Sequence, residues 1–124
     1  MPSELVVEYG PAVTNECRPT RERAEYQAMS RLLRVVDAVK AWAPTVENRL
    51  LKAYLTPRPE GGLRLIGIAR RIADENSLHD ALLQFSDELF EAGCEFGVNV
   101  YPDGTDDELQ AFFDPNSSLL FSWR

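Results

Sequence analysis

The chain has 124 residues, of which 44% are hydrophobic and 27% are charged, and its formal net charge is −7. This length and composition predict a single globular domain over residues 1–124 and exclude a fibrous or low-complexity protein. The negative charge argues against nucleic-acid and membrane partners, because binding to either polyanion needs an excess of cations. No run approaches the roughly 20 apolar residues that span a bilayer and no basic leader opens the chain, so we expect a cytoplasmic protein.

Charge is divided unevenly along the chain. Residues 1–73 carry twelve Lys and Arg against eight Asp and Glu, whereas residues 74–124 carry one against twelve. Such asymmetry indicates an interaction surface, unless the fold brings the two parts together so that their charges neutralise each other. Cys17 and Cys94 are isolated, without the clustered histidines of a metal site, and we assign them no role.

The first half of the chain predicts a strand, a long helix and a hairpin. Leu5–Tyr9 is rich in β-branched and aromatic residues, which is typical of a strand. Apolar residues then recur at three- and four-residue spacings, which predicts a helix from Thr20, as N-cap, to Ala43. Two apolar runs separated by prolines and glycines favour a β-hairpin from about Leu50 to Ile68 over a further helix.

The second half predicts another helix and strand. Ser77-x-x-Asp80 has the pattern of a capping box, in which two side chains satisfy free backbone N–H groups at a helix start. The apolar residues that follow lie on one face, which predicts a helix over Leu78–Ala92 ended by Gly93. Alternation of apolar and polar residues from Phe96 to Val100 predicts a half-buried strand.

The C-terminal residues allow two interpretations. Thr105-x-x-Glu108 is a second capping box, which favours a short helix that ends near Asp114 and a final strand over "SLLFSW". In the alternative, Leu109–Phe113 and Leu119–Trp123 form a hairpin about "DPNSS".

The resulting order is β-α-β-β-α-β, followed by a short helix and a strand, which is the order of ferredoxin-like α+β domains. Right-handed crossovers would place both long helices on one face of an antiparallel sheet. The other face would carry a mixed set of side chains, and its apolar area suggests a partner or a covering C-terminal strand. This set is Lys52, Tyr54, Ile66, Ile68, Asn99 and Tyr101.

The segment from Tyr101 to Ser118 concentrates five acidic residues: Asp103, Asp106, Asp107, Glu108 and Asp114. Their spacing does not match the linear calcium-binding loop, and turn chemistry and helix capping account for several of them, so we predict no metal. Capping alone does not require twelve acids in the last 51 residues, however. Docking on a basic surface is consistent with that excess.

Catalysis has little support in the sequence. His79 is the only histidine, and it lies beside two residues of a predicted cap, where a solvated helix start is the simpler explanation. We therefore predict neither catalytic residues nor a cofactor.

These observations predict a non-enzymatic acidic protein that binds a basic protein, as an inhibitor or immunity-type partner of a toxin or nuclease. The predicted binding residues are the five acids of the C-terminal segment, supported by Asp87 and Glu91. The alternative is a ferredoxin-like regulatory or assembly domain that dimerises or binds a small ligand through its open sheet face. That face would act through Tyr54, Ile66, Ile68 and Tyr101.

Overall fold

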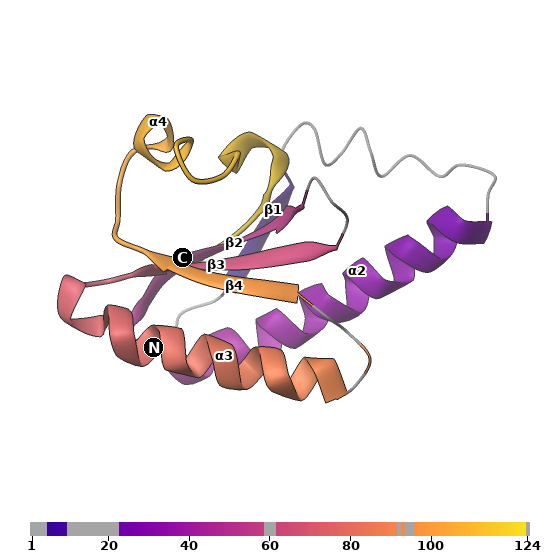
Figure 1. The fold of residues 1–124 in the computed structure, drawn as a ribbon, viewed down its shortest axis with the longest axis horizontal. Helices are drawn as coiled ribbons and strands as arrows, with labels where there is room; N and C mark the ends of the chain where they lie inside the picture. Colours follow the sequence, from indigo (N-terminus) through magenta and orange to yellow (C-terminus); the bar gives the residue numbers. More distant parts are fainter. Residues whose placement is uncertain (1–4, 10–22, 59–61, 92, 94–95, 124) are drawn as a thin grey trace.

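The structure is a computed structural model that describes residues 5–9, 23–58, 62–91, 93 and 96–123. Within these residues, five strands and three α-helices follow one another, and Figure 1 shows their arrangement. They are β1 (Leu5–Tyr9), α2 (Arg23–Trp42), β2 (Leu50–Pro57), β3 (Leu63–Ala69), α3 (Glu75–Glu91), β4 (Phe96–Tyr101), α4 (Asp106–Leu109) and β5 (Leu119–Trp123). The chain is therefore a mixed α+β protein, as the sequence predicts. No helix of the described residues is both long and apolar enough to cross a bilayer.

The five strands form one sheet in the order β1-β5-β2-β3-β4. Its neighbours are antiparallel except β3 and β4, which run parallel. The predicted antiparallel ferredoxin-like arrangement is therefore not matched. A split βαβ unit has another strand between its two parallel strands, whereas here α3 carries the chain back so that β4 pairs directly with β3. The last strand, β5, takes the position between β1 and β2.

The two long helices cover one face of the sheet, and the segment from α4 to β5 crosses the other face (Figure 1). The larger core lies beneath the helices and includes Val39 of α2, Leu82 of α3 and Phe121 of β5, none of which is exposed. The rings of Trp42 and Phe85 stack with centroids 4.8 Å apart and join the two helices. A smaller core lies on the opposite face, beneath α4.

The start of α3 differs from the prediction. A 3-10 turn over Ile72–Asp74 leads directly into the helix at Glu75, so Ser77 lies inside the first turn and is not a cap. Its hydroxyl donates to the backbone oxygen of Asp74 over 3.2 Å. The helix end is as expected, since Gly93 has a φ of +91°, which glycine adopts without strain.

The structure of the C-terminal segment distinguishes between the predicted short helix with a final strand and the alternative hairpin. Thr105 caps α4 in the predicted box, and β5 is the predicted final strand. The alternative hairpin is wrong, because Leu109 belongs to α4 and β5 pairs with β1 and β2. The helix is shorter than predicted and ends at Leu109, before the turn around Asp114. Thr20, Ala92, Cys17 and Cys94 lie outside the described residues.

Candidate protein-docking surface

Local hydrogen bonds fix the conformation of the acidic turn that opens α4. The Thr105 hydroxyl accepts from the Glu108 backbone N–H over 3.3 Å, and the Glu108 carboxylate accepts from the Thr105 N–H over 3.1 Å. The carboxylates of Asp106, Asp107 and Glu108 lie in the first turn, where partial positive charge at a helix start stabilises anions. All three side chains are exposed. This capped turn therefore fixes the backbone from which three exposed carboxylates project.

Two apolar side chains anchor this segment to the sheet. Leu109 and Phe113 are 2% and 8% exposed and pack in the smaller core. The rings of Phe113 and Tyr54 lie 4.9 Å apart. Burial of such side chains stabilises a contact by about 2 kcal/mol each, so the segment is held on the sheet as a layer of the fold.

The same contacts correct the expectation of an open sheet face. Tyr54, Ile66 and Ile68 face away from the long helices, as predicted, but α4 and the following turn cover them. Tyr101 is half-buried, and its ring stacks on Phe112 with centroids 4.5 Å apart. The covering element is a helix and turn in place of the strand that the sequence suggests. Within the described residues, these three side chains offer no surface for a dimer or a ligand.

Arg64 of β3 ties the segment to β4. Its guanidinium donates to the Asn99 side-chain oxygen, to the Tyr101 hydroxyl and, over 3.1 Å, to the backbone oxygen of Phe112. Asp114 closes the segment, because its two carboxylate oxygens accept from the Asn116 N–H and the Ser117 hydroxyl. Asp114 is therefore a structural cap as well as an exposed acid.

We define the acidic docking surface as Asp103, Asp106, Asp107, Glu108 and the exposed ring of Phe112. The Phe112 side chain is 53% exposed beside its buried neighbour Phe113. Among described residues, the one ion pair at this surface joins Lys52 and Asp103 at 4.0 Å. The described basic side chains therefore neutralise little of the charge at this point. Phe112 is thus an exposed aromatic side chain in the same segment as these carboxylates, and aromatic residues are enriched in protein interfaces.

Asp87 and Glu91 do not belong to this surface. Both are exposed on α3, which lies on the opposite face of the sheet from α4 (Figure 1). The structure therefore separates the seven predicted binding residues into three groups, which are the four acids of the docking surface, Asp87 and Glu91 on α3, and Asp114 in the turn before β5. This separation supplies a matched control, because charges on α3 can be reversed without touching the acidic docking surface.

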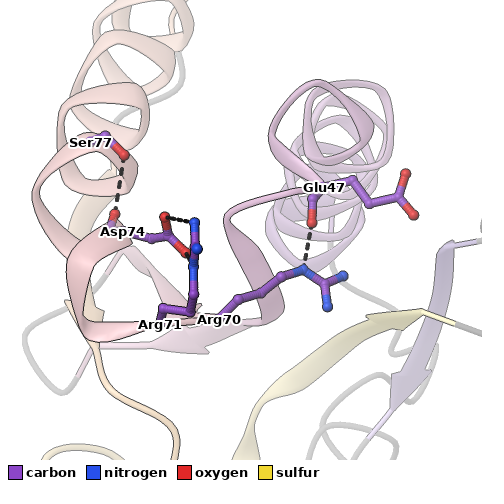
Figure 2. Close-up of polar contacts among 5 residues, drawn as sticks. All are labelled: Glu47, Arg70, Arg71, Asp74 and Ser77. Carbon is purple, nitrogen blue, oxygen red and sulfur yellow. Dashed lines mark hydrogen bonds and ion pairs between the residues drawn. The ribbon is translucent and has the colours of Figure 1, made fainter.

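The start of α3 contains a polar cluster that the sequence did not predict (Figure 2). The Arg71 guanidinium donates two hydrogen bonds of 3.1 Å to the carboxylate of Asp74, and Arg70 donates to the backbone oxygen of Glu47. The hydrogen bonds from Arg71 lower the pKa of Asp74 below its usual value. His79 lies in the helix that follows. Arg71 and Asp74 fix the turn that leads into α3, and Arg70 connects the end of β3 to the residues before β2. We therefore interpret the cluster as structural.

No group of three potential metal ligands converges within the described part of the chain. Comparisons with protein families, with curated proteins and with solved structures gave no match. The residue that sequence reasoning missed is Phe112. The adjacent phenylalanines were the available signal, since a segment lying on a sheet buries one of two neighbouring rings and exposes the other.

Proposed function

We propose that this chain is a non-enzymatic binding protein whose acidic docking surface binds a basic region of another protein. The observation that carries the proposal is the set of exposed carboxylates on a capped turn, in the same segment as an exposed aromatic ring. Complementary charge accelerates association and selects partners, while a central aromatic side chain contributes a large share of the binding free energy. The most concrete form of the proposal is an inhibitor or immunity-type protein that covers the cationic groove of a toxin or nuclease.

The rigidity of the surface supports this function. Thr105 and Glu108 cap the turn, Leu109 anchors it, and Arg64 holds the backbone at Phe112. A surface fixed before binding loses little conformational entropy on association, so more of the contact energy appears as affinity. An acidic tail without structure would lack this advantage.

The test is affinity capture from the native host at low salt, followed by titration of the purified partner at several salt concentrations. The wild type is compared with the Asp106→Lys/Asp107→Lys variant. The matched control is Asp87→Lys/Glu91→Lys, which makes the same change in charge on the other side of the sheet. We expect a basic partner that the wild type and the control bind equally, and that the test variant binds about tenfold or more weakly.

Salt supplies the second criterion. Binding between complementary charged surfaces weakens as ionic strength rises, because salt screens exposed charges over about 10 Å at 0.1 M. Equal loss in both variants, equal retention in both, or an affinity independent of salt would refute the proposed surface.

A further inference from the structure

A groove lies beside the turn that follows α4, and its described lining does not include the carboxylates of α4. It has a volume of about 570 Å³ and is lined by the end of β2, by Arg64 of β3, by residues 97–99 of β4 and by the turn from Phe112 to Ser117. Small-molecule sites in proteins commonly have volumes of about 300–1,000 Å³. The groove is therefore large enough for a small organic molecule.

The charge of the groove lining is unexpected in a protein with a net charge of −7. Arg58 and Arg64 both contribute to it. The three acceptors of Arg64 are an amide oxygen, a hydroxyl and a backbone carbonyl, all uncharged. No ion pair joins Arg64 to a carboxylate of the described residues, so the positive charge of this half-buried side chain is not neutralised by a described carboxylate.

Asp114 also lines the groove and is the one acid among the described residues of its lining. Both of its carboxylate oxygens accept hydrogen bonds from its own turn, at 3.0 Å and 2.7 Å. Its carboxylate is therefore engaged by Asn116 and Ser117. Three hydrogen bonds hold the guanidinium of Arg64 in place, and two of its five N–H groups remain for a ligand.

The floor of the groove is open because β4 has a glycine there. A Cβ placed on Gly97 would lie 3.7 Å from an Arg58 guanidinium nitrogen and 4.0 Å from Cγ of Arg64, between the two arginines. Asn99 lies two residues further along β4 on the same face of the strand, and Phe112 forms the opposite wall. Cations, a polar amide and an aromatic wall thus converge on one space.

We propose that this groove binds a small organic anion whose phosphate or carboxylate group meets Arg64 and whose flat apolar part lies against Phe112. A guanidinium presents N–H groups in the planar geometry that matches these oxyanions. The volume exceeds the need of an inorganic ion, which is why we assign an organic body to the ligand. The groove shares Phe112 with the acidic docking surface, but this inference requires no protein partner.

The experiment is a titration of isotope-labelled protein, followed by NMR of the arginine side-chain and β4 backbone N–H signals. The probes are phenyl phosphate and benzoate, which distinguish a phosphate from a carboxylate preference, and sodium chloride at matched ionic strength is the control. We expect saturable shifts of Arg64, Gly97 and Asn99 with at least one aromatic anion and none with chloride.

Two variants remove the site in different ways. Arg64→Gln removes the cation and is expected to weaken binding about tenfold or more, since hydrogen bonds to charged groups are each worth about 1.5–3 kcal/mol. Gly97→Val keeps both arginines and fills the floor, and a β-branched residue is favourable in a strand. Arg70→Gln, an exposed arginine of the other cluster, is the control.

The same variants define the results that would overturn the proposal. Shifts of the same size in the wild type and in the folded Gly97→Val protein would overturn it, as would linear, unsaturated shifts equal to those with chloride. Retention of affinity in Arg64→Gln would likewise overturn the assignment of Arg64.

Discussion

At the scale of single residues, the pair formed by Arg71 and Asp74 makes stability depend on pH. The guanidinium lowers the pKa of Asp74 from its usual 3.8, chiefly through its hydrogen bonds. A carboxyl group with a lowered pKa in the folded state stabilises the fold above its unfolded pKa, and this contribution is lost as the pH falls through the folded pKa. The stabilisation by Asp74 is therefore complete near neutral pH and disappears in acid.

Replacement of the Asp74 carboxylate tests this predicted dependence of stability on pH. We expect Asp74→Asn to lower the free energy of unfolding at about pH 7 and to differ less from the wild type at about pH 2, because protonation of the carboxylate removes its stabilising contribution as the pH falls through the lowered pKa. Urea unfolding at the two pH values measures the difference. Asp107→Asn, a change at an exposed acid without this partner, is the control. A difference for Asp74→Asn that stays constant over this range would show that the carboxylate charge contributes nothing.

The adjacent phenylalanines separate stability from binding. Phe113→Ala removes a ring that is 8% exposed, and we expect it to cost about 3–5 kcal/mol of stability. Phe112→Ala removes a ring that is 53% exposed, so its cost in stability is limited to about 1 kcal/mol from the stack on Tyr101.

The exposed ring of Phe112 is predicted to matter for binding instead. Loss of Phe112 is expected to weaken partner binding by about 2 kcal/mol. Thermal unfolding and partner titration of both variants measure the two effects, and equal binding by Phe112→Ala and wild type would remove this ring from the docking surface.

At the scale of elements, two strand glycines differ in what surrounds them. A Cβ on Gly67 of β3 would lie 2.9 Å and 3.3 Å from methyl carbons of Leu82 and Leu78, which are fully buried on α3. Gly67 therefore permits the close approach of α3 to the sheet. We expect Gly67→Ala to lower stability by about 1–3 kcal/mol, because the packed leucines must move.

Gly97 provides the comparison. Its nearest neighbours would lie at ordinary contact distances of 3.7 Å and 4.0 Å, so Gly97→Ala is expected to leave stability unchanged or slightly raised. Denaturant unfolding of the two alanine variants measures the contrast. Equal losses of stability would mean that the backbone freedom of glycine, and not the packing of α3, determines the effect.

The individual helices and strands show which parts of the fold could be predicted from the sequence. Periodicity and turn residues located the hairpin of β2 and β3, the helix α3 and the strand β4, because these signals are local. The capping box at Thr105 was predicted for the same reason. At the start of α3 the box at Ser77 was wrong, since a 3-10 turn already continued into the helix from Ile72. A pattern of four residues does not reveal what the chain does immediately before it.

At the scale of the whole molecule, local signals are insufficient. The order of elements along the chain leaves open which strands become neighbours, and here β5 pairs with both β1 and β2. That choice determined the candidate site as well. Because β5 lies between β1 and β2, the segment before it crosses the face that carries Ile66 and Ile68. This segment therefore covers the surface that was predicted to be open. Arg64 and Phe112 became partners for the same reason, although 48 residues separate them.

The position of β5 between β1 and β2 predicts different effects on stability for deletions at the two ends of the chain. Deletion of residues 119–124 removes Leu119 and Phe121, both fully buried, and the indole of Trp123, which donates to the backbone oxygen of Leu50 over 2.9 Å. It also leaves β1 without its partner strand. Deletion of residues 1–9 removes only the edge strand β1 and leaves β5-β2-β3-β4 as a continuous sheet.

We therefore expect the shorter deletion to be the more damaging. Loss of residues 119–124 should abolish the cooperative unfolding transition, whereas the protein without residues 1–9 should unfold cooperatively at a lower urea concentration than the full chain. Circular dichroism during urea unfolding measures both, and hydrogen exchange of the full chain is expected to be slowest in β2, β3 and β5 and faster in the edge strands β1 and β4. A cooperative fold that survives without residues 119–124 would contradict the sheet order, because no other described strand joins β1 to β2.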